Sequence, residues 1–287
     1  MGVAHAAANL SRLELARNVS LFHTVLLPVK DICLLSAEEL LLAYSDAGLR
    51  AVSLRTGLLA AKKLTAIQNV YRVAFDTHTD TLLLVVETPT YVNQLVSLRR
   101  NASEWLEVQR INISTPARYI HIPFISVCDS RVLLGNGGKT LYVFDVNEEH
   151  NLSAAGHVTL ESAFRWVACT RRGNDTLVAF AHESSVSLQR LAALPLRLER
   201  LANVNVNVTN PKPFFFRDLL LVVEYSVFSK TYAIESFRVT DNALIERRVL
   251  LDAQAAVGIR GWALAGEQLV IMTPNEFLVY EFSSNGE

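Results

Sequence analysis

Four acidic residues follow apolar segments at similar offsets and could do chemistry together. Glu87 and Glu224 come directly after Leu-Leu-Leu-Val-Val segments, and Asp46 and Glu183 lie one position later relative to their own segments. Acids that ring one face of a repetitive fold could bind a cation or act as general acid and base on a glycoside or a lactone. The simpler interpretation is that acids at strand ends are solvated. We favour it, because the sequence shows no second group that would orient or activate them.

Other catalytic patterns are incomplete. Gly138-Lys139-Thr140 ends like a phosphate-binding loop, but Leu133 stands where the first glycine of that motif belongs. The seven histidines show neither His-x-His nor His-Glu-x-x-His spacing, which a metal site within one segment would need. No Gly-x-Ser-x-Gly segment marks a nucleophilic serine. The sequence therefore predicts no catalytic residues, no metal site and no cofactor.

A sequence repeat runs through most of the chain. It indicates the structural elements that would position the acidic residues. A basic residue recurs four positions after an apolar or small one, at intervals of 46, 47, 47, 43 and 48 residues: Arg17, Lys63, Arg110, His157, Arg200 and Arg248. A period of this size is typical of arrays of identical supersecondary units. Lys and Arg on the outermost strand of each unit would discourage edge-to-edge association. A basic belt for an acidic partner is the alternative.

Each unit has the pattern of four short strands separated by turns. The second strands are apolar on both faces, as strands between two neighbouring sheets must be: 40–42, 82–84, 132–134, 177–179, 219–221 and 269–271. The last unit stops after three strands, and residues 12–19 supply an unattached fourth. The sequence therefore predicts an all-β, six-bladed β-propeller of four-stranded antiparallel blades, with an N-terminal strand completing the last blade. Residues 1–287 would form one domain, and seven blades are the minor alternative.

The predicted third strands, Leu141 to Val146 and Leu49 to Gly57, alternate and then end in a polar residue or a glycine turn. In this they resemble the third strand of WD-repeat-like propellers. The resemblance covers the chain loosely: no unit has the Trp-Asp pair or the Gly-His opening, and Phe144-Asp145 comes nearest. It implies the propeller superfamily, and it transfers no binding residue to this chain.

Aromatic and basic residues gather in the predicted connections between the second and third strands and between the blades. Such residues in exposed loops anchor many protein interfaces. The candidate partner-binding residues are Tyr91, Arg118, Tyr119, Lys212, Phe214, Tyr225, Phe228 and Tyr232. The sequence thus favours a non-enzymatic scaffold or adaptor that binds a protein or peptide, as a monomer or within a larger complex. The alternative is a glycosidase-like or lactonase-like hydrolase that uses the four acids in a central channel.

Composition argues against two classes of partner. The net charge is -1 and the isoelectric point is near 6.7, so no general attraction to nucleic acid or anionic lipid is expected. No apolar run reaches the roughly 18 residues that a membrane helix needs. We therefore expect neither nucleic-acid nor membrane binding.

Two observations on compartment conflict. Cys33, Cys128 and Cys169 are few, odd in number and far apart, and the N-terminus has no signal-peptide pattern. This favours a cytoplasmic or nuclear protein whose cysteines are small buried apolar residues. A secreted protein is the alternative, because seven Asn-x-Ser/Thr acceptor sites occur, at Asn9, Asn18, Asn101, Asn112, Asn151, Asn174 and Asn207.

Overall fold

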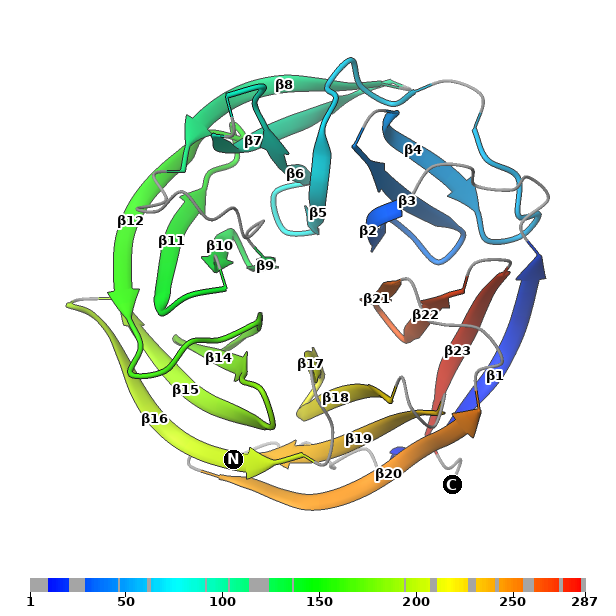
Figure 1. Ribbon diagram of the computed structural model, residues 1–287, viewed down its shortest axis with the longest axis vertical. Helices are drawn as coiled ribbons and strands as arrows, with labels where there is room; N and C mark the ends of the chain where they lie inside the picture. Colours follow the sequence, from blue (N-terminus) through cyan, green and yellow to red (C-terminus); the bar gives the residue numbers. More distant parts are fainter. Residues whose placement is uncertain are drawn as a thin grey trace, which may run out of the picture.

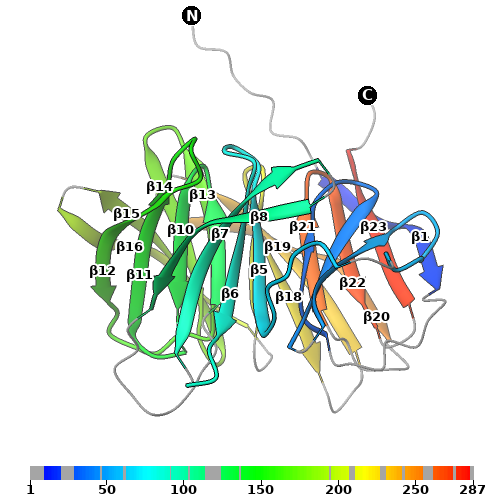
Figure 2. The ribbon, with the colours of Figure 1, turned by 90° about the horizontal axis from the view of Figure 1, so that it is seen from above.

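Six antiparallel sheets are arranged in a ring about a central axis, each sheet forming one blade (Figures 1 and 2). The computed structural model describes residues 10–20, 29–45, 47–60, 63–90, 92–102, 104–113, 124–135, 137–193, 195–206, 211–226, 231–240, 243–254, 261–273 and 276–284. Every regular element in these ranges is a β-strand, and none contains a helix able to cross a membrane. The protein is a six-bladed β-propeller, as the repeat predicts.

The strands of blades 1 to 3 are β2 (Val29–Leu34), β3 (Glu39–Tyr44) and β4 (Gly48–Ser53); β5 (Val70–Asp76), β6 (Thr81–Glu87), β7 (Asn93–Asn101) and β8 (Glu104–Asn112); β9 (Phe124–Cys128), β10 (Arg131–Gly135), β11 (Thr140–Val146) and β12 (Leu152–Thr159). The strands of blades 4 to 6 are β13 (Trp166–Arg172), β14 (Asp175–Ala181), β15 (Ser185–Ala193) and β16 (Leu196–Asn205); β17 (Lys212–Phe216), β18 (Leu219–Ser226), β19 (Thr231–Val239) and β20 (Leu244–Gln254); β21 (Gly261–Ala265), β22 (Gln268–Met272), β23 (Glu276–Ser284) and β1 (Leu10–Ser20).

The second strand of each blade holds the core together. Along β6, Leu82 and Leu84 pack toward blade 1, whereas Leu83 and Val85 pack toward blade 3, and all four side chains are inaccessible to solvent. Successive side chains of a strand point to opposite faces, so a strand between two sheets must be apolar throughout. The described residues form six such cores, one between each pair of neighbouring blades. The apolar triplets of the sequence are confirmed as these buried strands.

The N-terminal strand closes the ring. β1 pairs antiparallel with β23 from Leu10 opposite Ser284 to Ser20 opposite Glu276. Its side chains Leu13 and Val19 are buried in the cores on the two sides of blade 6. The first and last strands of the chain are therefore held in one sheet (Figure 1), which confirms the predicted shared blade.

Blade 1 departs from the predicted four strands, because its sheet has only β2, β3 and β4. The segment that follows β4 touches it at separate points: Leu59 forms an isolated bridge with Val52, and Ala60 N donates to Ala51 O at 2.8 Å. Leu64 O then accepts a hydrogen bond from Trp105 N of blade 2 at 3.0 Å. Leu64 N still donates to Leu49 O of β4 at 3.1 Å, so the segment bridges blades 1 and 2 without forming a regular strand, and Lys63 lies outside any strand.

The basic repeat coincides with an irregularity in every described outer strand. Each of these strands has at least one residue skipped in the pairing with the third strand, and one skipped residue in each lies close to the basic position: Ala16, Val108, Ala155, Leu201 and Leu250. A basic residue of the repeat lies one or two positions from each of them. Bulges twist an edge and charges repel another strand, so both features oppose association of the outer edges.

The cysteine expectation needs a correction. Cys128 ends β9 and Cys169 lies in β13, and a disulfide joins them with their Cα atoms 5.8 Å apart. They are 41 residues apart in sequence, so their spacing gives no sign of a pair. The propeller brings them together, because β9 and β13 are inner strands of neighbouring blades. Cys33 is a free, partly buried thiol.

Candidate binding face

One face of the ring carries both kinds of connection that the sequence singles out. Ile113 N, in the link that follows blade 2, donates to Asn93 O at the start of its third strand, at 2.8 Å. Phe164 N, in the link after blade 3, likewise donates to Gly138 O between the second and third strands of blade 3, at 3.1 Å. We call this side, where the inner strands begin, the link face. The inner strands all run in one direction along the axis, so their first residues meet there.

Five side chains from five blades form a group on the axis at the link face, here called the axial cluster: Asp31, Arg72, Phe124, Trp166 and Lys212. They come from the first to third positions of the inner strands β2, β5, β9, β13 and β17. Blade 6 begins its inner strand with Gly261, which has no side chain to add. Contacts between blades that are not neighbours, such as Arg72 of blade 2 over the Trp166 ring of blade 4, show that the cluster spans the axis.

Arg72 is held in place by backbone groups. Its Nη1 donates to Tyr71 O at 2.8 Å and to Lys30 O of blade 1 at 3.2 Å. The guanidinium lies 5.3 Å from the centre of the Phe124 ring and 5.8 Å from that of Trp166. Its Nε is buried without a hydrogen-bond partner among the described residues. The charge is thus fixed in position before any ligand arrives.

Trp166 is the centre of the cluster. Its ring is tilted by 37° against the Phe124 ring, with the ring centres 4.5 Å apart, and Lys212 Nζ lies 4.0 Å from its centre. A cation over an indole face is attracted by the ring quadrupole. The tryptophan ring thereby contacts two cations from different blades, Arg72 of blade 2 and Lys212 of blade 5.

Burial perturbs both titrating groups of the cluster. Desolvation raises the pKa of Asp31, although Arg72 and a hydrogen bond from Val73 N, 3.1 Å from Asp31 Oδ2, partly oppose the rise. The pKa of Lys212 is lowered to about 8, chiefly by desolvation and to a lesser extent by the positive charge of Arg72, while Asp31 opposes the fall. Strongly shifted groups that share one site are typical of functional positions.

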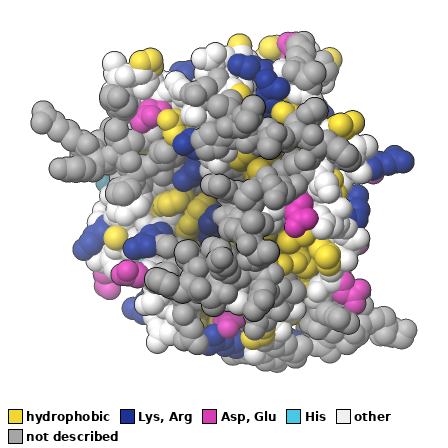
Figure 3. Space-filling view, turned by 45° about the vertical axis from the view of Figure 1, so that its right-hand side comes forward, with side chains coloured by type: hydrophobic (Ala, Val, Ile, Leu, Met, Phe, Trp, Pro, Cys, Tyr) yellow, Lys and Arg dark blue, Asp and Glu magenta, His cyan; other side chains and the backbone are white. Residues whose placement is uncertain are grey.

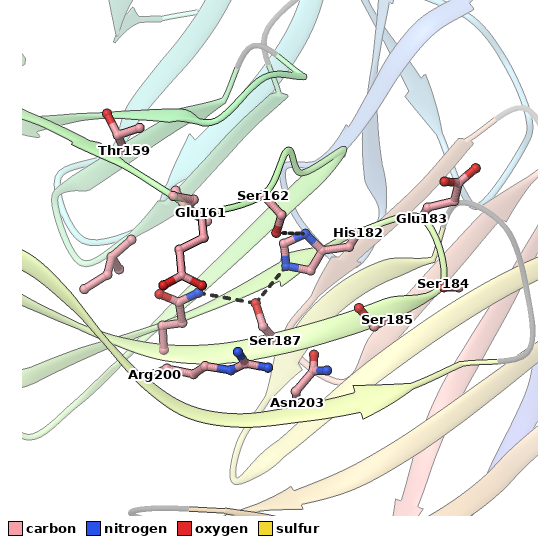
Figure 4. A pocket seen from close by; sticks show the side chains of 13 residues that line it. Thr159, Glu161, Ser162, His182, Glu183, Ser184, Ser185, Ser187, Arg200 and Asn203 are labelled. Atoms are coloured by element: carbon pink, nitrogen blue, oxygen red, sulfur yellow. Dashed lines mark hydrogen bonds between the residues drawn. The ribbon is translucent and has the colours of Figure 1, made fainter.

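A polar groove of about 610 Å³ opens on the same face between blades 3 and 4 (Figure 4). His182, directly after β14, points between Ser162 of the link and Ser187 of β15. Its Nδ1 donates to Ala163 O at 2.9 Å, so in the neutral ring Nε2 accepts the hydroxyl proton of Ser187 at 3.0 Å. Arg200 of the outer strand lies on the other side.

A serine that donates to a histidine, itself oriented by a carbonyl, has the connectivity of a nucleophile and its base. The Ser187 side chain, however, is 4% exposed, and its oxygen also accepts from Gln189 Nε2 at 3.4 Å. A buried hydroxyl that already makes two hydrogen bonds does not present its oxygen to a substrate. We interpret the network as one that fixes the shape of the groove.

The predicted partner-binding residues fall into three groups. Lys212 belongs to the axial cluster. Phe214 packs against the core between blades 5 and 6, and Tyr232, 3% exposed, lies in that core with its hydroxyl bonded to that of Tyr280. Tyr232 is therefore a core residue rather than a surface anchor, and Phe214 is partly buried against the same core. The structure does not describe Tyr91, Arg118, Tyr119 and Phe228, nor the side chain of Tyr225.

The predicted channel acids are not brought together in the described part of the structure. Glu87 ends the second strand of blade 2, and Glu183 follows that of blade 4 and forms an exposed ion pair with Arg165 at 3.6 Å. Second strands lie one position out from the channel. Asp46 and the side chain of Glu224 are outside the described residues.

Sequence reasoning did not find four of the five members of the axial cluster. Phe124 and Trp166 begin inner strands whose starts carry no common motif, and Asp31 and Arg72 lie two residues into theirs. A usable signal did exist: each is a polar or aromatic residue near the start of the first strand of a unit. Of the five, only Lys212 is among the residues that the sequence predicts to bind a partner, because it lies in the predicted link between blades 4 and 5.

Acidic and basic side chains are interspersed over the side seen in Figure 3. In the described ranges no three His, Cys, Asp or Glu residues are grouped as they would be to hold a metal ion.

Comparisons with known proteins identify the fold. No protein-family model matches the sequence, and no curated protein is similar in sequence. A crystal structure of a protein from Lactobacillus plantarum is similar with a TM-score of 0.55 and 13% identity, over 85% of this chain and 77% of that chain. The structure of U3-55K is similar with a TM-score of 0.57 and 11% identity, over 93% of this chain and 99% of that chain. These similarities show the fold alone.

Proposed function

We propose that the protein is a non-enzymatic scaffold that binds a protein or peptide partner on its link face. The axial cluster carries this proposal, because side chains from five blades meet there at the start of the inner strands. Aromatic and Arg side chains fixed in a partly buried site are the usual anchors of interfaces. A fold by itself does not assign a function, so the proposal rests on this site.

The groove between blades 3 and 4 supports the same face. Trp166 of the axial cluster pairs with Ala181, and the next residue, His182, lines the groove. A partner segment that reaches the axis could therefore continue outward along the groove. The hydrolase alternative has no comparable support, since Glu87 and Glu183 lie on second-strand ends rather than in one pocket.

The test compares captured partners among three forms of the protein. Wild type, an Arg72→Ala/Lys212→Ala double variant and an Arg171→Ala control are immobilised and exposed to a lysate of cells that make the protein. Arg171 is an exposed cation near the opposite end of β13, so its replacement removes a positive charge without touching the link face. We expect partners captured by wild type and control to be lost from the double variant, as measured by quantitative mass spectrometry. An identical set from all three would contradict the proposal.

Two finer assignments are proposed on other grounds. We infer that the chain is a divergent WD-repeat-like propeller, on the strength of its alternating third strands. We also infer that it works in an oxidising compartment. The Cys128–Cys169 disulfide supports this, and the described asparagines of the acceptor sites, Asn18, Asn101, Asn112, Asn151 and Asn174, are all exposed. Production in a secretory host should then give a mass excess that an N-glycosidase removes.

A further inference from the structure

The centre of the axial cluster has more positive than negative charge. Asp31, Arg72 and Lys212 interact electrostatically with one another, and their ionised forms sum to +1. No carboxylate in the described part of the chain lies within ion-pair distance of Lys212, whose ammonium instead rests on the Trp166 ring. Asp31 is the one acid that acts on both cations, so it cannot balance the charge of the pair. A partly buried excess of positive charge is costly, and such a cost is usually retained where a ligand supplies the missing negative charge.

We propose that the axial cluster binds one carboxylate group, carried by an Asp or Glu side chain of an extended peptide partner. This proposal rests on the proposed function and names the chemistry that the link face recognises. Arg72 and Lys212 are the two residues that contact the carboxylate, and Asp31 sets how much charge the site accepts.

Arg72 is prepared for this contact by its backbone bonds. The two carbonyls that accept from its Nη1 stop the guanidinium from turning, and the rings of Phe124 and Trp166 support it. Fixing a side chain before binding removes an entropic cost that the complex would otherwise bear. Charge-assisted bonds from a guanidinium or an ammonium to a carboxylate are about twice as strong as neutral ones.

The charge sum favours a carboxylate over a phosphate. A single negative charge balances the +1 of the trio, whereas the second charge of a phosphate would face Asp31 without a further cation from the cluster. Like charges brought together at a partly desolvated site oppose binding. The two aromatic rings also limit the access of water, which strengthens each charge interaction in the site.

Protonation of Lys212 makes the binding depend on pH. Its pKa of about 8 in the free protein means that the ammonium is present at pH 7 and largely lost at pH 9. A bound carboxylate stabilises the ammonium, so binding takes up protons as the pH rises through this range. The affinity for an acidic peptide should therefore fall severalfold from pH 7 to pH 9.

The experiment selects peptides from a displayed library of random dodecapeptides on immobilised wild-type protein. We expect selected peptides to contain at least one Asp or Glu whose replacement by Asn or Gln weakens binding about tenfold or more. Arg72→Gln and Lys212→Met should each weaken the same peptides about tenfold. The Arg171→Gln control should bind them within about twofold of wild type.

A conservative variant separates charge from shape. Lys212→Arg keeps its charge at pH 9, so its affinity should no longer fall between pH 7 and pH 9. Melting curves of every variant establish that each is folded, and Lys212→Met retains the length and apolar contact of the lysine stem.

Each contrary outcome has a distinct meaning. Peptides that need the link face but contain no required Asp or Glu would overturn the carboxylate proposal and leave the scaffold function standing. Tighter binding after replacement of the required Glu by phosphoserine would identify phosphate as the ligand and overturn it as well. Peptides that bind all variants alike, or no selection on wild type at all, would contradict the scaffold function together with this proposal.

Discussion

At the scale of single residues, the axial cluster contains a desolvated cation that lowers the stability of the folded protein. The Lys212 ammonium is desolvated by its position at the start of β17, and the positive charge of Arg72 repels it. The cation–π contact with the Trp166 ring offsets only part of this free-energy cost. The ordinary pKa of lysine is 10.5, and the folded protein lowers it to about 8. At this residue the unfolded chain therefore binds more protons than the folded one between these pH values, so the contribution of Lys212 to the free energy of unfolding rises as the pH increases through that interval.

Replacing Lys212 by methionine should consequently stabilise the protein at pH 7. We expect a gain of about 2 kcal/mol in the free energy of unfolding, since the fall in pKa from 10.5 to about 8 corresponds to roughly 3 kcal/mol and the lost cation–π contact offsets part of it. The gain should shrink toward pH 10, where the lysine of the folded protein is already neutral. Urea denaturation at both pH values measures this. A variant less stable than wild type at pH 7 would show that Lys212 is not strained.

At the scale of elements, the strands could be predicted from the sequence and the site largely could not. Triplets such as Leu82-Leu83-Leu84 reveal a second strand because both of its faces are buried, and this requirement acts on adjacent residues. The axial cluster is assembled from residues roughly one blade apart, so only the closed ring brings Arg72 beside Trp166. The pairing of Cys128 with Cys169 is hidden for the same reason.

The disulfide makes a prediction about how two of these elements are joined. It closes a loop with a sequence separation of 41 residues between β9 and β13. Replacing Cys128 or Cys169 by serine should lower the free energy of unfolding by about 2–4 kcal/mol under oxidising conditions. A reductant should have the same effect on wild type, as measured by the shift of the melting temperature.

Cys33→Ala is the matched control for that experiment. Cys33 is not bonded to another cysteine, and burial raises its pKa to about 12, so its thiol should be inert. The variant should respond to reductant as wild type does. Equal melting temperatures with and without reductant in wild type would contradict a stabilising disulfide.

At the scale of the whole molecule, closure of the ring depends on a strand from the far end of the chain. β1 covers the edge of β23 and buries Leu13 and Val19 in the two cores that flank blade 6. Without it, blade 6 has three strands and exposes a long edge of unpaired N–H and C=O groups on β23. Closure therefore couples the stability of blade 6 to that of blades 1 and 5.

Deleting residues 1–20 should open the ring and cost far more than trimming a terminus. Loss of two buried apolar side chains alone removes about 3–6 kcal/mol, which corresponds to a fall in melting temperature of about 10 °C or more. The exposed edge of β23 should also cause association that increases with concentration, seen by light scattering.

A deletion of residues 1–9, which stops before β1, serves as the control and should melt close to the full chain. A synthetic peptide of residues 10–20 should restore stability to the longer deletion, because it can re-form the pairing with β23. An unchanged melting temperature in the longer deletion would mean that the propeller is held together by its other five blades.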